Sequence, residues 1–172
     1  MLTDFAELSG GRSVLNNGAV IQNGAAYFKG ASLVLPAFIL NDFGDKIQID
    51  VDVMYENPTK NEIPVLNNAN CDLESTISLT LKDALTSNCY LEASIKVENV
   101  PQQVKITTPV SPNVWNSFTF SKKGDNIILL KNAVVAGQVT QAGYFEFQDS
   151  AMVAGKAPQK TPFQGYMKNV SN

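Results

Sequence analysis

Short runs in which apolar and polar residues alternate are the feature that most constrains how this chain can fold. The clearest run is KIQIDVDVMY, from Lys46 to Tyr55, where every second residue is apolar. A period of two sends successive side chains to opposite faces of a strand. Residues 46–55 therefore predict a central strand with one buried face and one face in water.

Shorter runs of the same kind follow one another along the chain and are separated by turn residues. We find no amphipathic helix, no repeat and no linker, and Asn23-Gly24 is a strong signal for a type I′ hairpin turn. About a dozen short strands at this spacing predict one all-β domain over residues 1–172, an antiparallel β-sandwich or barrel. The other expected strands are residues 19–22, 25–29, 32–35, 63–66, 77–81, 90–97, 104–106, 144–148 and 163–170.

A further hairpin is expected between Val114 and Val135, around a turn at residues 122–125. Two phenylalanines share one face of its first strand, and a third strand at residues 133–140 would continue it as a meander. The chain's only tryptophan, Trp115, stands at the start of this hairpin. We interpret Trp115 as a core anchor rather than a binding ring, because most aromatic side chains of a sandwich are buried.

The charge of the chain and its lack of histidine exclude several classes of function. The net charge is −3, and the largest basic cluster is the pair Lys122-Lys123. Nucleic-acid binding needs several converging basic residues, so it is not expected. The absence of His excludes Ser-His-Asp and Cys-His catalysis within this chain, as well as zinc sites that need imidazole.

The two cysteines, Cys71 and Cys89, are too few for a disulfide scaffold. A simple hairpin of residues 75–81 and 90–96 would leave Cys71 well beyond the level of Cys89, which favours two thiols over a bridge. Residues 1–20 lack the basic and apolar regions of a signal peptide. The longest apolar stretch, residues 31–40, is too short to span a bilayer, so membrane insertion is not expected.

Four segments resemble laminin-G-like domains of the concanavalin-A-like lectin and glucanase superfamily. They are GAAYFKGASLVLP at residues 24–36, the strand at 46–55, the Trp115 hairpin with its Gly124-Asp125 turn, and the closing strand after Phe163. They occur in the order of that family. The resemblance implies a jelly-roll sandwich of two antiparallel sheets, although Asn116 and Ala133 replace a histidine and a glycine of the family pattern.

Asp50, Asp52 and Glu56 share the polar face of the strand at residues 46–55. Side chains at i and i+2 lie roughly 6.5–7 Å apart on a strand, near the separation of glycosidase carboxyl pairs. The carboxylate spacing departs from the one that glucanases of the superfamily carry, and no aromatic platform is evident beside it. A solvated sheet face is therefore the simpler interpretation, with a hydrolase or a cation site as alternatives.

Tyrosine rings could stack on a sugar, because they bury apolar area while keeping a polar edge. The chain has five such rings, at Tyr27, Tyr55, Tyr90, Tyr144 and Tyr166. Asp50, Asp52 and Tyr144 are the candidate ligand-binding residues.

Two long polar loops, residues 67–74 and 149–160, are expected at the rim of the sandwich, where recognition loops usually lie. Asp72, Glu74 and Asp149 are their candidate Ca²⁺ ligands, because Ca²⁺ needs clustered oxygen atoms. Unrelated surface acids explain the same residues equally well. No other cofactor is expected.

These observations together favour a non-enzymatic surface module, and a glycan-active hydrolase is the weakest alternative. Our hypothesis is a virion protein of decoration, fibre or tail type with a lectin-like jelly roll, located on the virion surface. The alternative is an extracellular laminin-G-like domain that binds glycan or protein. The expected partners are a surface glycan or other structural proteins of an assembly, with a homo-oligomer as the expected state.

Overall fold

The computed structural model describes residues 14–35, 45–56, 58–71, 73–146 and 148–171 of the chain. These residues form fourteen strands and no helix, so the described part contains no helix able to span a membrane. The strands are β1 (Leu15–Asn17), β2 (Val20–Gln22), β3 (Ala25–Lys29), β4 (Ser32–Leu35), β5 (Lys46–Tyr55), β6 (Ile63–Asn67), β7 (Ile77–Lys82), β8 (Tyr90–Ile95), β9 (Val104–Pro109), β10 (Asn116–Lys123), β11 (Asn126–Lys131), β12 (Val134–Thr140), β13 (Met152–Ala154) and β14 (Gln164–Ser171).

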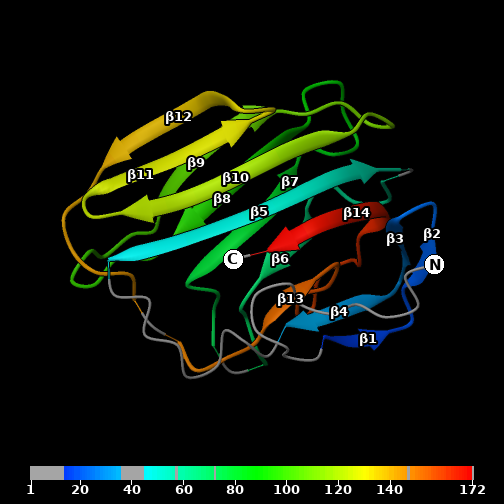
Figure 1. Ribbon diagram of the computed structural model, residues 1–172, viewed down its shortest axis with the longest axis horizontal. Helices are drawn as coiled ribbons and strands as arrows, with labels where there is room; N and C mark the ends of the chain where they lie inside the picture. Colours follow the sequence, from blue (N-terminus) through cyan, green and yellow to red (C-terminus); the bar gives the residue numbers. More distant parts are fainter. Residues whose placement is uncertain (1–13, 36–44, 57, 72, 147, 172) are drawn as a thin grey trace.

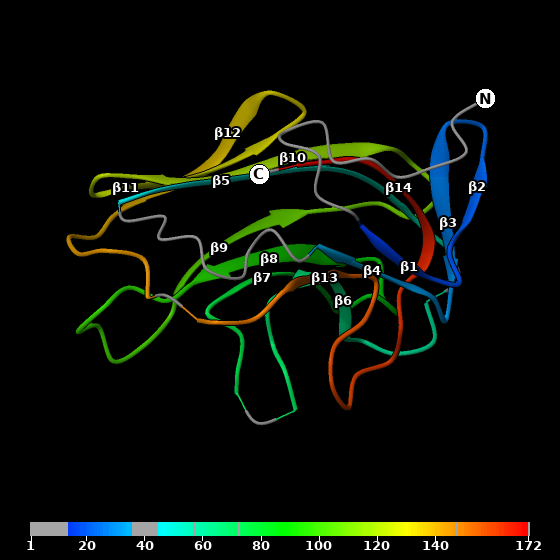
Figure 2. The same cartoon turned by 60° about the horizontal axis from the view of Figure 1, so that its bottom comes forward.

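The strands form two antiparallel sheets of seven, which confirms the predicted all-β jelly-roll sandwich (Figure 1). Sheet I has the strand order β1-β4-β13-β6-β7-β8-β9, and sheet II has the order β12-β11-β10-β5-β14-β3-β2. Figure 2 shows the two sheets as stacked layers, with loops of sheet I projecting away from sheet II. Each sheet therefore has one face in the core and one outer face.

The core lies between the sheets and is built by the alternation seen in the sequence. On β5 the side chains of Ile47, Ile49, Val51, Val53 and Tyr55 are all buried, and the residues between them are not. Phe118 and Phe120 of β10 lie opposite Val51 and Ile49 and are buried with them. The strand predicted at residues 46–55 is thus confirmed at both ends.

Two tight turns between neighbouring strands contain a glycine with positive φ. Asn23 and Gly24 both have positive φ, 53° and 75°, and join β2 to β3 as the type I′ signal predicted. Gly124, with φ 54°, stands in the turn between β10 and β11. Lys122, which we placed in this turn, instead belongs to β10; its side chain faces the core and is buried.

Three segments differ from the prediction. The loop expected at residues 149–160 contains β13, a three-residue strand between β4 and β6, which is too short to show alternation. The strand β1 was not predicted either, because all three of its residues are exposed. Among residues 144–146 and 148, which the structure describes, the strand expected at 144–148 is reduced to a single bridge between Val97 and Phe145.

The interpretation of Trp115 as a core anchor is wrong. Its side chain is 37% exposed, because Trp115 has the parity opposite to Asn116, Phe118 and Phe120, which face the core. The same alternation that buries the phenylalanines therefore turns the tryptophan outward.

Candidate functional site

A polar groove runs over the outer face of sheet I. It consists of two adjoining hollows of about 840 and 580 Å³, which share Glu74, Ser75, Gln103 and Lys105 among their lining residues. Residues 69–71 and 73–75, which we call the 69–75 wall, line one side of the smaller hollow, and residues 157–160 form another wall. We call the two hollows together the sheet I groove.

The floor of the groove consists of outward side chains from β7, β8 and β9. Ser78, Ser94 and Lys105 form one row across these strands, and Thr80 and Glu92 belong to the next row. The hydroxyls of Ser78 and Ser94 lie 2.7 Å apart and share a hydrogen bond. The floor is therefore a set of closely spaced hydrogen-bonding groups.

The charges along the groove are paired. Lys105 Nζ lies 3.2 Å from Glu92 Oε1, and the Glu92 side chain is only 16% exposed. Glu62 is bound by two lysines: Lys160 Nζ lies 2.8 Å from its Oε1, and Lys82 Nζ lies 3.0 Å from its Oε2. Since Lys160 ends the 157–160 wall and Lys82 belongs to β7, Glu62 ties that wall to the floor.

The same lysines affect the ionisation of Glu62. The hydrogen bond from the Lys160 ammonium, with help from Lys82, holds the pKa of Glu62 below its ordinary value, although partial burial acts in the opposite direction. The Glu62 carboxylate therefore stays ionised at neutral pH.

A buried hydrogen-bond network fixes the base of the 69–75 wall. The Asn68 side-chain oxygen accepts bonds from the backbone N–H groups of Thr76 and Ile77, at 2.9 and 3.1 Å. The Asn68 backbone oxygen accepts bonds from Gln148 Nε2, at 2.9 Å, and from the Ser150 hydroxyl. Because these groups are buried and mutually satisfied, both ends of the wall are held in place.

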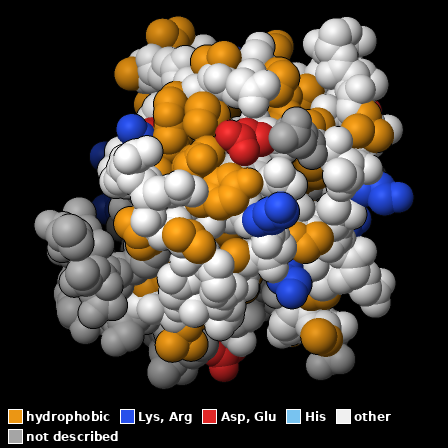
Figure 3. Space-filling model, turned by 90° about the vertical axis from the view of Figure 1, so that its right-hand side faces the viewer, with side chains coloured by type: hydrophobic (Ala, Val, Ile, Leu, Met, Phe, Trp, Pro, Cys, Tyr) orange, Lys and Arg blue, Asp and Glu red, His pale blue; other side chains and the backbone are white. Residues whose placement is uncertain are grey.

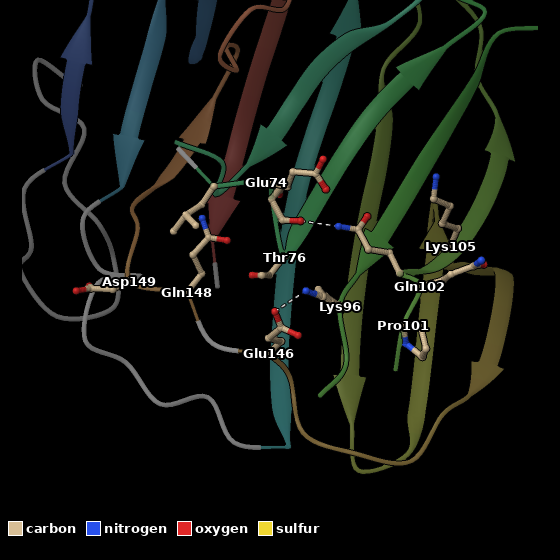
Figure 4. Close-up of a pocket in the computed structure, with 12 residues that line it drawn as sticks. Glu74, Thr76, Lys96, Pro101, Gln102, Lys105, Glu146, Gln148 and Asp149 are labelled. Carbon is tan, nitrogen blue, oxygen red and sulfur yellow. Dashed lines mark hydrogen bonds and ion pairs between the residues drawn. The ribbon is translucent and has the colours of Figure 1, made fainter. Parts of the chain in front are cut away.

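Figure 4 shows the larger hollow, where Lys96 and Glu146 form an ion pair of 2.7 Å. Two of the three predicted Ca²⁺ ligands, Glu74 and Asp149, line this hollow, but their carboxylates point in opposite directions (Figure 4). The third, Asp72, lies outside the described residues. The described part of the chain holds no group of three acidic, His or Cys side chains placed for a metal, and the Ca²⁺ site stays a prediction.

Asp50 and Asp52 lie on the outer face of sheet II, on the side of the sandwich away from the groove. Asp50 accepts hydrogen bonds from Thr119 Oγ1 at 2.6 Å and from Gln48 Nε2 at 2.8 Å. Asp52 accepts a bond of 2.7 Å from Asn169 Nδ2. Both carboxylates are half-buried and bonded to neutral groups, as the interpretation of a solvated sheet face requires.

Tyr144, the third candidate ligand residue, does not join the two aspartates. Its side chain is 60% exposed, and its backbone oxygen accepts a 3.0 Å bond from Glu98 N. This places Tyr144 next to the Val97–Phe145 bridge that follows β8 of sheet I. The three predicted residues thus do not form one site.

The aromatic platform that the sequence did not reveal lies next to Asp52. Tyr27 and Tyr166 have ring centroids 4.8 Å apart, and Trp115 lies 6.5 Å from Tyr166. The rings come from β3, β14 and the residue before β10, so only the sheet register brings them together. Tyr27 and Tyr166 are among the five tyrosines that the sequence offered as sugar-stacking rings, and the outward parity of Trp115 was a further signal.

Neither cysteine is placed for catalysis. Cys71 and Cys89 are both free thiols, as expected, with Cys71 exposed and Cys89 buried. Burial is the main cause that raises the pKa of the Cys89 thiol, so the thiolate is disfavoured at neutral pH. Burial likewise raises the pKa of the neighbouring Tyr55 hydroxyl.

No family model matches the sequence, and no curated protein matches it at a significant level. Solved structures with a similar fold exist at low identity. Domain 4 of the GH43 arabinanase AbnA from Geobacillus stearothermophilus, solved with arabinotriose, has a TM-score of 0.63 at 15% identity, covering 95% of this chain and 76% of that one. The mouse laminin α1 LG4-5 pair has a TM-score of 0.59 at 12% identity, covering 93% of this chain and 41% of that one.

The CBM40 module of the Ruminococcus gnavus IT-sialidase, bound to α2,3-sialyllactose, has a TM-score of 0.62 at 15% identity. The match covers 90% of this chain and 95% of that one. At these identities the likeness concerns the fold alone. The chain has the concanavalin-A-like jelly-roll β-sandwich fold that is also found in laminin G domains, as the resemblance implied.

Proposed function

We propose that the chain is a non-catalytic binding module that recognises an uncharged glycan in the sheet I groove. The observation that carries this proposal is the lining of the groove, which presents many hydroxyl, amide, carboxylate and ammonium groups between two anchored walls. Glycans present closely spaced hydroxyls, and a site of closely spaced donors and acceptors matches them.

The charge balance argues for an uncharged ligand. The smaller hollow is lined by three acids, Glu62, Glu74 and Glu92, and by three lysines, Lys82, Lys105 and Lys160. All three lysines and two of the acids are engaged in ion pairs. A charged ligand would have to break a pair, whereas a neutral one can bond to the paired groups from outside.

Two of the similar structures support a glycan as the ligand class, because the arabinanase domain and the sialidase module were solved with bound oligosaccharides. A hydrolase is disfavoured by the groove's chemistry. Two of its carboxylates, Glu62 and Glu92, are bound by lysines, which leaves them less available as the acid and base of a glycosidase.

The test is calorimetric titration with arabinotriose as the neutral probe and sialyllactose as the charged one. Glu92→Gln should weaken arabinotriose binding by about tenfold, since a buried charged hydrogen-bonding group contributes about 1.5–3 kcal/mol. The matched control is Asp50→Asn on sheet II. If Glu92→Gln leaves arabinotriose binding unchanged and Asp50→Asn abolishes it, the proposal is wrong. The glycan site would then lie at Asp50 and Asp52 on sheet II.

The finer form of this proposal places the module on a surface, either of a virion, as a decoration, fibre or tail component, or in the extracellular space. Edge strand β12 exposes Val134 and Val135, at 69% and 59%, which a neighbour in an assembly or a homo-oligomer would cover. Light scattering tests this: a closed oligomer that dissociates in Val135→Lys supports assembly, and a monomer at all concentrations contradicts it.

We retain a weak Ca²⁺ site at the rim, with Glu74, Asp149 and Asp72 as its residues, as a separate proposal. An ion bound only to the folded protein must raise its melting temperature. A Tm that rises with added Ca²⁺ and falls in EDTA supports the site, whereas an unchanged Tm contradicts it.

A further inference from the structure

The outer face of sheet II carries a row of large side chains that runs across five neighbouring strands. The register pairs Val20 with Tyr27, Tyr27 with Tyr166, and Tyr166 with Met54. Trp115 precedes Asn116, whose partner is Val53, so Trp115 lies beside Met54. All five side chains share the face that points away from the core, and we call them the aromatic row.

The three rings of this row form a compact cluster. Their centroids lie 4.8 Å apart for Tyr27 and Tyr166 and 6.5 Å apart for Tyr166 and Trp115, with interplanar angles of 44° and 54°. Trp115 is 37% exposed, and the two tyrosines are half-buried. Figure 3 faces the end of the sandwich where β2 and β3 lie, and shows hydrophobic side chains gathered there beside an acidic group and lysines.

Polar side chains border the row on both sides. On one side the register places Lys168 of β14 beside Asp52 of β5 and Asp52 beside Ser117 of β10. The Lys168 ammonium lies 4.6 Å from the centre of the Trp115 ring. On the other side Gln164 pairs with Lys29. Hydrogen-bonding side chains therefore lie on the same face as the rings, two residues further along the strands on either side of the row.

The dimensions of the row decide between a sugar and a protein partner. Five strands span about 19 Å, and one row of side chains is about 7 Å wide, giving an apolar strip of about 130 Å². A stable protein interface buries about 800 Å² on each partner, with apolar contacts at its centre. The area of the strip is far below the area that a stable protein interface buries. The width of the strip, however, matches the width of one sugar ring.

We propose that the aromatic row is a second saccharide site, which binds one sugar ring and is independent of the sheet I groove. A sugar ring has an apolar C–H face and a rim of hydroxyls, so it can stack on Tyr166 or Trp115 while its hydroxyls reach the polar border. Asp52 is the acceptor on this border, and Asn169, with φ 52° at an irregularity of β14, holds its carboxylate through the 2.7 Å bond.

The sole tryptophan makes the proposal testable, because all tryptophan emission comes from Trp115. The protein is titrated with glucose, galactose, mannose, N-acetylglucosamine, arabinotriose and sialyllactose. We expect a saturable change of emission with at least one probe. It should persist in the groove variant Glu92→Gln, weaken about tenfold in Tyr166→Ala, and weaken about threefold in Asp52→Asn.

Asp52→Asn keeps the size of the side chain, so it remains informative if Tyr166→Ala fails to fold. Three outcomes overturn the proposal: no emission change with any probe, an emission change that Glu92→Gln removes, or self-association that Trp115→Ala removes. The first leaves the proposed groove function standing if calorimetry still detects binding. If calorimetric binding of the probe that changes the emission is unaffected by Glu92→Gln, the groove is overturned and the aromatic row is kept.

Discussion

On sheet I several outward side chains form ion pairs, whereas the outward face of sheet II carries a cluster of aromatic rings and two carboxylates bonded to neutral groups. Within the described residues, all four ion pairs belong to the sheet I side. On sheet II the one close approach of a lysine to an aromatic ring is a cation–π contact, and Asp50 and Asp52 accept bonds from hydroxyl and amide donors. One pattern of alternation thus builds two outer faces of different chemistry.

This difference sets what each face can respond to. Ion pairs weaken when salt is added or when a carboxylate is protonated. Stacking between aromatic rings is affected by neither change. The groove should therefore respond to salt more strongly than the aromatic row. The following experiments test this contrast, beginning with the backbone that supports each face.

Two glycines support the two faces, and alanine at each should have unequal effects. A Cβ at Gly165, under the aromatic row, would lie 2.2 Å from the Met54 backbone oxygen, at φ 140°. A Cβ at Gly155, beside the 157–160 wall, would lie 2.5 Å from a ring carbon of Phe28, at φ 82°. The Phe28 ring can shift to make room for a Cβ, whereas the Met54 backbone cannot, because it is paired within sheet II. Gly165→Ala should thus lose about 4 kcal/mol or fail to fold, and Gly155→Ala about 2 kcal/mol.

Urea denaturation of both variants measures these losses. Gly30, which has nothing within 4 Å of an added Cβ and φ 73°, is the control for the backbone conformation alone, and Gly30→Ala should lose about 1 kcal/mol. Equal losses at Gly165 and Gly30 would contradict the argument, because they would mean that the β14–β5 contact yields easily.

The second experiment removes the network below the 69–75 wall. Asn68→Ala leaves the buried N–H groups of Thr76 and Ile77 without their acceptor, so it should lose about 2–3 kcal/mol and abolish binding in the groove. Asn132→Gly is the matched control. It removes an exposed bond of 2.9 Å to Ser117 N on sheet II, and glycine tolerates the φ of 50°.

Thermal unfolding and calorimetry measure both effects, and Trp115 emission reports on sheet II. Asn68→Ala should leave the emission spectrum unchanged. A shifted spectrum would mean that the two faces are coupled through the core, and would break the contrast between them.

Much of this fold was predictable because alternation alone decides which residues of a strand face the core. The strand at residues 46–55 and the Asn23-Gly24 turn follow from local pattern, and the two-sheet sandwich follows from the family resemblance. Even the error at Trp115 could have been avoided, since Phe118 and Phe120 set the inward parity and Trp115 has the other one.

The sites were harder to predict because they depend on which strands become neighbours. Asp50 and Asp52 stand on the polar face of their strand as expected, but the sequence does not say that the groove forms on the opposite sheet. The aromatic row joins residues as distant as Tyr27 and Tyr166, which only the pairing of β3 with β14 brings together. Strand β13, which joins β4 to β6 in sheet I, has three residues and no readable period.

The third experiment uses pH. The Lys160 and Lys82 contacts lower the pKa of Glu62, so their contribution to stability is present above the ordinary value of 4.5 and is lost as the pH falls through the lower folded value. Since the Glu62 side chain is 40% exposed, this contribution is less than about 1 kcal/mol. Glu62→Gln should be less stable than the wild type at pH 7, and this deficit should be smaller at pH 3.

Denaturation at both pH values measures this. Glu98→Gln, which changes an exposed acid outside the four ion pairs, is the control and should have no effect at either pH. A Glu62→Gln variant whose deficit is as large at pH 3 as at pH 7 would mean that the side chain stabilises the wall by packing rather than by charge.

The smallest expected effect is on sheet II, at the contact between Lys168 and Trp115. Lys168→Met keeps most of the side-chain length but removes the ammonium that lies 4.6 Å from the ring centre, so it should cost about 0.5 kcal/mol and shift the Trp115 emission. Lys29→Met, an exposed lysine on β3, is the matched control and should leave the spectrum unchanged. Because no acid pairs with Lys168 among the described residues, 0.5 M salt should change the wild-type spectrum little. A spectrum that changes with salt as strongly as with the substitution would mean that sheet II also depends on screened charge, and the contrast between the two faces would then be one of degree.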